Sequence, residues 1–149
     1  MDWHVEAAEA LFSAARLQFK RLEHYYFHNC LYESVWRNNR RRFEERTPTA
    51  ELINSFGRDH RVIFVGDASM SPYEILSPGG SVEHMNPESG ETWIKRATAA
   101  WPRSVWINPT PVEQWRYSQS TQILSALFGG RMFGLTPDGV EQAMRALTH

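Results

Sequence analysis

The chain has 149 residues, a length that suits one domain of ordinary size and is too short for two. Hydrophobic residues make up 42% of the sequence and charged residues 22%, so the composition is that of a globular protein without a disorder signature. Sixteen Lys and Arg residues stand against 17 Asp and Glu residues, which gives a formal net charge of -1. This balance offers no electrostatic basis for binding nucleic acid or an anionic membrane.

Cys30 is the single cysteine of the sequence, so an intramolecular disulfide and a zinc site made of cysteine pairs are both excluded. No base stands next to it that would activate its thiol as a nucleophile. Residues 1–20 lack the basic start and the uninterrupted apolar run of a signal peptide, and no stretch reaches the roughly 18 apolar residues of a membrane span. The sequence therefore predicts a cytoplasmic protein that does not enter a membrane.

The first half of the chain shows three patterns of secondary structure. Apolar residues recur at three- and four-residue steps over 3–21, which predicts an amphipathic helix. Aromatic and β-branched runs over 24–36 predict a β-hairpin. Thr47 and Pro48 are expected to open a short helix that Gly57 ends, because Thr caps helices, Pro suits the first helical position and Gly lies just past the end.

The second half alternates buried-type strands with helices. RVIFVG at 61–66 and SVWIN at 104–108 are short apolar runs with little alternation, as expected of strands covered on both faces of a parallel sheet. The stretch 67–90 is rich in Gly and Pro and is expected to be a long, irregular and functional loop. Helices are predicted at 91–100, at 120–128 and from Thr136 onward.

These elements predict one α/β domain over 1–149, with a doubly wound, mostly parallel sheet, helices on both faces and one antiparallel hairpin strand. Ligands of such folds bind beyond the carboxyl ends of the strands. The loops that begin at Asp67 and Asn108 are therefore the places where a functional site is expected.

Two short motifs carry the functional interpretation: ERTPTAEL at 45–52 and VIFVGDASMSPYE at 62–74. In this order, after a helix and a hairpin, they resemble the second and third parts of the metal-ion-dependent adhesion site of von Willebrand factor A domains. The resemblance covers nearly the whole chain and is greatest to the bacterial CoxE-like group that is associated with MoxR-type AAA ATPases. It implies that Thr47 is the metal-site threonine and Asp67 the metal-site aspartate.

In that family a D-x-S-x-S loop precedes the first amphipathic helix and supplies three further metal-coordinating side chains. Here the helix begins at the N-terminal Met, so the resemblance implies a chain that lacks the first central strand and this loop. The implied cofactor is Mg²⁺, or Mn²⁺, and Mg²⁺ prefers oxygen ligands at about 2.0 to 2.1 Å. An open position on the metal would accept a carboxylate from a protein partner, which is binding rather than catalysis.

Residues 67–71, DASMS, are themselves a D-x-S-x-S sequence and could be the first metal loop. The residues that follow would then have to supply a hairpin, a threonine loop and three more strands, yet they contain only one convincing strand. The order of Thr47 before Asp67 favours the first assignment, with Ser69 and Ser71 as hydroxyls that support the site or face a partner.

Each residue assigned to the site also has a purely structural explanation. Thr47 is equally well explained as a helix cap, and Asp67 as a turn former at the end of a strand. The basic run at 37–42 fits a solvated surface, and the histidines lack the spacing of metal ligands.

The resemblance implies a metal-ion-dependent protein–protein interaction module that is not an enzyme. Its partner would be a MoxR-type AAA ATPase or the client of that ATPase, in the assembly or activation of another complex. One alternative is an inactive, truncated fragment, since loss of a central strand would leave backbone donors and acceptors unpaired. Another is a hydrolase or nucleotide-binding enzyme on the same scaffold, although the sequence has no phosphate-binding glycine loop and no nucleophile elbow.

Overall fold

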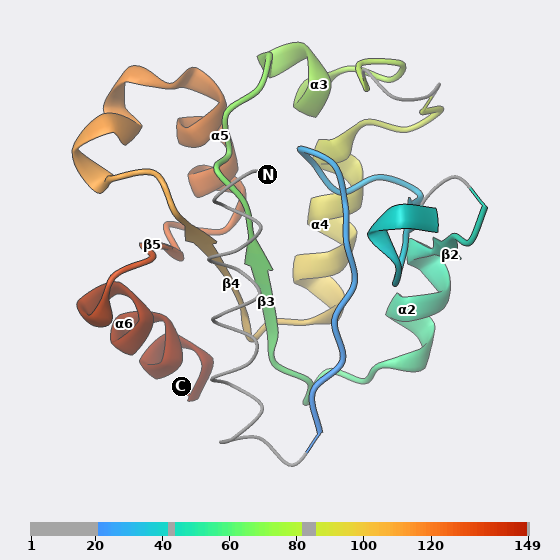
Figure 1. Ribbon diagram of the computed structural model, residues 1–149, viewed down its shortest axis with the longest axis horizontal. Helices are drawn as coiled ribbons and strands as arrows, with labels where there is room; N and C mark the ends of the chain where they lie inside the picture. Colours follow the sequence, from blue (N-terminus) through green and yellow to red (C-terminus); the bar gives the residue numbers. More distant parts are fainter. Residues whose placement is uncertain (1–20, 42–43, 82–85, 149) are drawn as a thin grey trace.

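The computed structural model describes residues 21–41, 44–81 and 86–148. Its strands are Ser34–Val35 (β1), Thr47–Pro48 (β2), Val62–Val65 (β3), Ser104–Asn108 (β4) and Met132–Gly134 (β5). β3, β4 and β5 form a parallel sheet in that order, and β1 pairs with β2 in an antiparallel arrangement (Figure 1). The described architecture is therefore mixed α/β, as the sequence pattern predicts.

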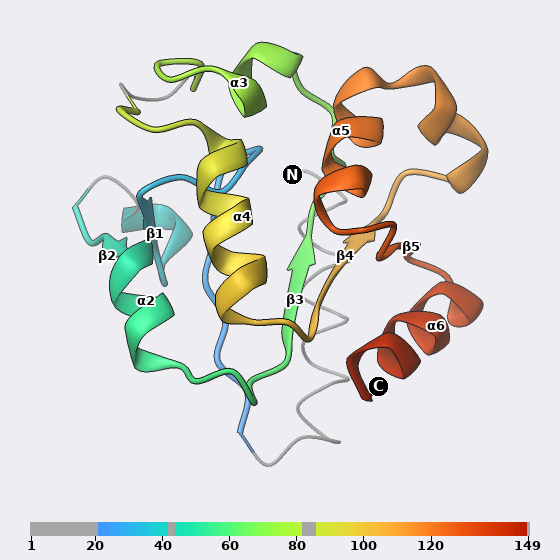
Figure 2. The ribbon, with the colours of Figure 1, turned by 180° about the vertical axis from the view of Figure 1, so that it is seen from behind.

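Helices cover both faces of the parallel sheet. The helices are Thr49–Ser55 (α2), Pro72–Leu76 (α3), Gly90–Ala100 (α4), Gln119–Leu127 (α5) and Pro137–Thr148 (α6), with 3₁₀ helices at Asn39–Arg41 (η1) and Val112–Tyr117 (η2). Buried residues of α4 and α5 pack with one face of the sheet, and those of α6 with the other (Figures 1 and 2). The prediction of helices on both faces is confirmed. Among the described residues, no helix combines the length and the apolarity needed to cross a membrane.

An aromatic cluster fills the face beneath α4 and α5. Trp106 of β4 is fully buried, and its ring stacks on Phe64 of β3 with centroids 5.9 Å apart. Phe128 meets both rings edge-on, at 5.6 Å from Trp106 and 5.2 Å from Phe64. The indole N–H of Trp106 donates to the carbonyl of Gly66 at 2.8 Å, so the polar atom of this large side chain is satisfied.

β4 is the central strand of the sheet, and all five of its residues are buried. On the α6 side, Val105 and Ile107 pack with Ala143 and Leu147 in a second apolar cluster. Burial on both faces explains why the sequence of this strand shows no polar alternation. The two predicted strands form and pair in parallel, but only β4 is buried throughout; in β3 Phe64 alone is buried and the other three residues are half-buried.

The prediction of a β-hairpin over 24–36 is largely wrong. One antiparallel bridge joins Tyr26 to Trp36, whose N–H groups donate to each other's carbonyl oxygens at 2.6 and 3.1 Å. β1 pairs with β2 instead of with a hairpin partner, and the N–H of Thr49 donates to the carbonyl of Glu33 at 2.8 Å. The backbone groups after the turn are therefore satisfied by a segment further along the chain.

The helix predicted to open at Thr47 begins two residues later, at Thr49, and ends at Ser55 rather than next to Gly57. Thr47 lies in β2, so its interpretation as a helix cap is wrong. Pro48 occupies the capping position with ψ at 132°, an extended conformation that continues the strand, and makes no side-chain capping bond.

The region after β3 is more regular than expected, because α3 lies within the stretch 67–90 that the sequence predicts to be an irregular loop. The 3₁₀ helix η2 and the short strand β5 are also absent from the predicted elements. The amphipathic helix predicted over 3–21 lies outside the described residues, apart from its last position.

Candidate functional site

The loop that leaves the carboxyl end of β3 has an unusual backbone. Asp67 is half-buried, and its Oδ1 accepts a hydrogen bond from the N–H of Ser69 at 3.0 Å. Between them Ala68 has a φ of 58°, in the left-handed region that residues with a Cβ seldom adopt. Strained backbone of this kind often lies at functional sites and requires support from its surroundings.

That support comes from the first turn of α5. Ser120 and Thr121 are buried, and their hydroxyl groups donate to the carbonyl of Ala68 at 2.6 and 3.2 Å. The N–H of Met70 donates to the Ser120 hydroxyl at 3.1 Å. These bonds join the loop after β3 to the first turn of α5, the helix that follows the loop after β4.

Ser71 caps α3. Its hydroxyl accepts a hydrogen bond from the N–H of Tyr73 at 3.3 Å, while its own N–H donates to the carboxyl group of Glu74 at 3.0 Å. This capping box explains why a helix forms in a region rich in Gly and Pro. The Ser71 hydroxyl therefore has a structural role, whereas the side chain of Ser69 is exposed and available to a ligand.

Glu74 joins α3 to the turn at residues 29–32. Only 6% of its surface is exposed, and its second carboxyl oxygen accepts from the side-chain N–H of Asn29 at 2.9 Å. The hydroxyl of Tyr32 donates to the Glu74 carbonyl at 2.7 Å. Burial is the main cause that raises the pKa of the Tyr32 phenol above its usual value, so this donor stays protonated.

The structure does not bring Thr47 and Asp67 together. Thr47 pairs with Val35 in the two-stranded sheet, while Asp67 follows β3, and both views show β2 well apart from the carboxyl end of β3 (Figures 1 and 2). Among the described residues, no group of three or more His, Cys, Asp or Glu side chains could hold a metal ion. Asp67 is thus the one implied ligand at this edge, and the Mg²⁺ or Mn²⁺ site stays a prediction.

The loop expected to carry function after Asn108 begins with a buried side chain. Asn108 is fully buried, and its Oδ1 accepts from the N–H of Thr110 at 2.9 Å. This bond fixes the turn that leads into η2. Asn108 therefore shapes the loop and does not face a ligand.

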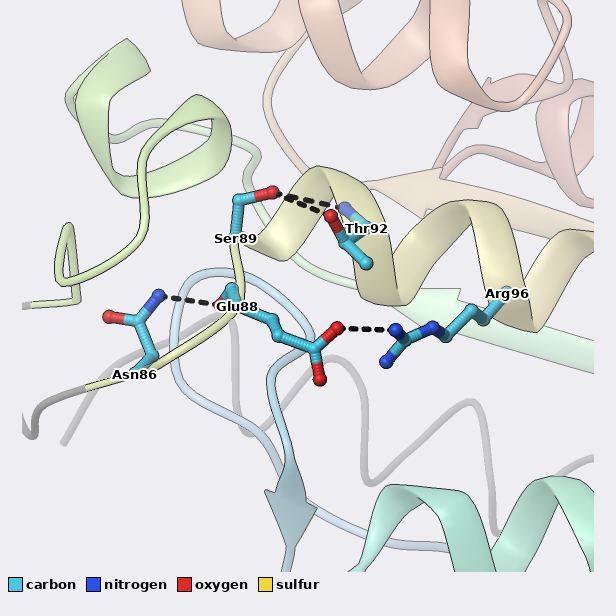
Figure 3. A network of polar contacts seen from close by, with 5 residues as sticks. All are labelled: Asn86, Glu88, Ser89, Thr92 and Arg96. Atoms are coloured by element: carbon cyan, nitrogen blue, oxygen red, sulfur yellow. Dashed lines mark hydrogen bonds and ion pairs between the residues drawn. The ribbon is translucent and has the colours of Figure 1, made fainter.

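A polar network fixes the entrance of α4 (Figure 3). The Ser89 hydroxyl accepts from the N–H of Thr92 at 3.2 Å and so caps the helix. Glu88, which precedes α4, forms an ion pair with Arg96 within that helix. Because both of these side chains are substantially exposed, the pair contributes little to stability.

Asn86 closes the loop that precedes this network. It is 1% exposed, its Oδ1 accepts from the N–H of Ser81 at 2.9 Å, and its carbonyl accepts from the N–H of Gly79 at 2.7 Å. Its side-chain N–H donates to the Glu88 carbonyl at 2.9 Å (Figure 3). With its polar groups used in this way, Asn86 has a structural role.

The exposed large hydrophobic side chains of the described residues all lie on α3 and η2. They are Tyr73 (60% exposed), Leu76 (46%), Val112 (53%) and Tyr117 (76%). Both elements lie at one end of the molecule, beyond the carboxyl ends of β3 and β4 (Figures 1 and 2). We call these four side chains, together with Asp67 and Ser69, the carboxyl-edge face.

The apolar part of this face was not predicted from the sequence. The sequence did contain a signal, because large apolar residues stand in stretches that are otherwise typical of polar loops. Such residues do not pack in the core and are therefore expected to be exposed.

Cys30 is buried, and burial raises the pKa of its thiol to about 12. The thiol stays protonated below that pH, so at pH 8 iodoacetamide should label the folded chain at least about 100-fold more slowly than an exposed cysteine. Mass spectrometry of samples labelled in buffer and in guanidinium chloride checks this. Fast labelling of the folded chain would contradict the burial of Cys30.

A comparison of the chain with protein-family models, with curated proteins and with solved structures finds no match. The functional interpretation consequently depends on the residues of this chain and on the resemblance described above.

Proposed function

We propose that this chain is a protein–protein interaction module that binds its partner through the carboxyl-edge face. The observation that carries the proposal is that the exposed large hydrophobic side chains of the described residues all lie on α3 and η2, two elements at the same end of the molecule (Figure 1). Large apolar side chains that are exposed at one end of a molecule, rather than scattered over it, favour a protein-binding surface there. Tyrosine suits such a surface because it offers a large contact area at a small cost in conformational entropy.

Two features support the placement of the binding site on this face. Ligands of open α/β sheets bind beyond the carboxyl ends of the strands, where Asp67 and Ser69 lie. The backbone here is also held in place, because Ser120 and Thr121 hold Ala68 in its left-handed conformation. A fixed face loses little conformational entropy when a partner binds.

The same proposal assigns the chain a doubly wound fold of the von Willebrand factor A type and a metal-dependent mode of binding. The resemblance of the motif around Asp67 supports it, as does the position of Asp67 directly after a parallel strand; Thr47 lies elsewhere, in β2. A bound Mg²⁺ or Mn²⁺ would supply a coordination position for a carboxylate of the partner. The partner proposed from the resemblance is a MoxR-type AAA ATPase or its client.

The direct test is the affinity of the chain for the purified MoxR-type ATPase of its native organism, measured by calorimetry in Mg²⁺ buffer. Substitution of Leu76→Ser together with Tyr117→Ser should weaken binding at least about tenfold, because central apolar contacts dominate interface energies. The matched surface control is Gln142→Ser, an exposed change on α6 that should leave the affinity unchanged.

Metal dependence is tested in the same experiment with Asp67→Ala and with a chelator. Both should reduce the affinity to the same level if Asp67 holds the metal. Unchanged affinity of the Leu76→Ser, Tyr117→Ser variant would contradict the binding face. Loss of binding in that variant together with indifference to the chelator would contradict only the metal, and absence of binding by the wild type would contradict the ATPase partner.

A further inference from the structure

Arg116 of η2 is an exposed arginine that forms no ion pair with a carboxyl group of the described residues. Several other exposed arginines do pair with glutamates. They are Arg21, Arg37, Arg41, Arg96 and Arg145. The Arg116 guanidinium lies instead over the ring of Tyr117, 4.9 Å from its centroid. Because no described residue accepts a hydrogen bond from its N–H groups, these groups are available to a ligand.

Glu113 is the one acidic residue of η2, and it does not neutralise this charge. It lies three positions before Arg116, and residues at this spacing stand on the same side of a 3₁₀ helix. Both side chains are exposed, yet they form no ion pair, and the guanidinium is directed to Tyr117. An aromatic ring attracts a guanidinium electrostatically, so the stack restricts the Arg116 side chain before any ligand binds.

Trp115 fixes the backbone that carries this stack. Its indole N–H donates to the carbonyl of Thr110 at 2.8 Å, and its side chain packs against the main apolar core. The Trp115 carbonyl accepts from the N–H of Ser118 at 3.1 Å and from the side-chain N–H of Gln122 at 3.3 Å. η2 is thus joined to the core and to α5, so its exposed side chains need little ordering when a ligand binds.

We propose that Arg116 binds a carboxylate of the partner protein, supplied by an aspartate or glutamate within an apolar segment. The inference rests on the proposed function, because it specifies the chemistry of the partner at the carboxyl-edge face. A guanidinium is planar and can bind both oxygens of a carboxylate while it stacks on a ring. The exposed apolar residues Val112 and Tyr117 are the two ends of η2, with Arg116 between them, so the acidic residue has apolar neighbours on both sides.

This carboxylate site is separate from the metal-dependent mode of binding. A cation at Asp67 would lie in the loop between β3 and α3, whereas Arg116 lies on η2. α5 contacts both α3 and η2 and stands between them in both views (Figures 1 and 2). An ion pair with Arg116 needs no metal, so a chelator leaves it unchanged.

The test uses the full chain, in the presence of a chelator, and three peptides of five residues with two apolar residues on each side of a central one. The first has a central glutamate and capped ends, and the second a central glutamine and capped ends. The third has the glutamine and a free terminal carboxylate. NMR titration follows the Nε–H signal of Arg116.

We expect the glutamate peptide to shift this signal and to bind at least about threefold more tightly than either other peptide. Equal affinity of the two capped peptides overturns the proposal, as does an Arg116 signal that no peptide shifts. Equal affinity of the glutamate peptide and the peptide with the free end also overturns it, because a chain terminus then serves as well as an internal acidic residue.

Variants of the chain separate the stacked arginine from general positive charge. Arg116→Gln should abolish the preference for the glutamate peptide, and Arg116→Lys should lose most of it, because an ammonium group cannot form the planar, two-fold contact. The matched control is Arg58→Gln, which removes an exposed arginine before the amino end of β3 and should keep the preference. Thermal melts confirm that the variants fold. A preference that persists in Arg116→Gln, or falls equally in Arg58→Gln, overturns the proposal.

Failure of this inference can be told apart from failure of the proposed function. If the ATPase binds the wild type and not the Leu76→Ser, Tyr117→Ser variant while the peptides bind equally, the binding face stands and the acidic partner residue is wrong. If the glutamate peptide is preferred through Arg116 and the ATPase does not bind, the carboxylate site stands and the ATPase partner is wrong.

Discussion

Replacement of Gly139 by Ala is expected to lower the free energy of unfolding by about 3 kcal/mol and the melting temperature by roughly 6 to 12 °C. Gly139 is buried in the first turn of α6. A Cβ atom there would stand 2.0 Å from the carbonyl oxygen of Gly134 and 2.8 Å from its carbonyl carbon. Because backbone atoms cannot turn aside, α6 would have to move away from β5 and weaken the cluster of Ala143 and Leu147.

Thermal and urea denaturation of purified protein measure this effect. Gly57→Ala is the matched control, because a Cβ at Gly57 would meet no atom within 4 Å and the residue has no left-handed backbone. Its stability should stay within about 0.5 kcal/mol of the wild type. A Gly139→Ala variant as stable as Gly57→Ala would show that α6 does not pack on the end of β5.

Replacement of Glu74 by Ala is expected to destabilise the chain by about 2 to 3 kcal/mol. The buried carboxyl group accepts hydrogen bonds from Asn29 and from the N–H of Ser71. Its loss would leave the Asn29 side chain without this partner, in a turn where Asn29 has a φ of 58°. It would also remove half of the capping box of α3, the helix that carries Tyr73 and Leu76.

The control is Glu141→Ala on α6, which removes an exposed ion pair with Arg145 and should cost less than about 1 kcal/mol. Urea denaturation compares the two variants. Limited proteolysis provides a second measurement, because loss of the cap should expose the region around α3 to cleavage before the rest of the chain unfolds. Equal stability of both variants would show that the Glu74 network contributes little.

The long elements of the second half could be predicted from the sequence. β4 has the predicted bounds, Ser104–Asn108, and β3 lies within the predicted 61–66. α4, α5 and α6 begin and end within about a turn of the predicted positions. The three helices are long and β4 is fully buried, so the spacing of apolar residues along the sequence follows which side chains pack in the core.

The short elements could not be predicted, since contacts distant in sequence decide them. β5 has three residues and is held by β4, to which the carbonyl of Arg131 and the N–H of Leu135 bond at 2.9 and 3.2 Å. α3 has five residues and depends on the contact of Glu74 with Asn29, 45 positions earlier. Local propensity in stretches this short is too weak to identify either element.

Part of the candidate site was predictable for a different reason. The position of Asp67 follows from the rule that functional loops leave the carboxyl ends of parallel strands, and the structure places it there. The position of Thr47 depends on how β1 and β2 pair, which the hairpin prediction missed. The roles of Ser71 and Ser120 in holding the backbone required the three-dimensional structure.

Hydrogen-exchange mass spectrometry of the chain, with and without the purified MoxR-type ATPase, shows whether a protein partner binds at the carboxyl-edge face. We expect slower exchange in peptides that cover 67–77 and 112–118, with little change in α2 and α6. Protection confined to α2 or α6, with these two regions unchanged, would contradict the assignment of this face as the binding site.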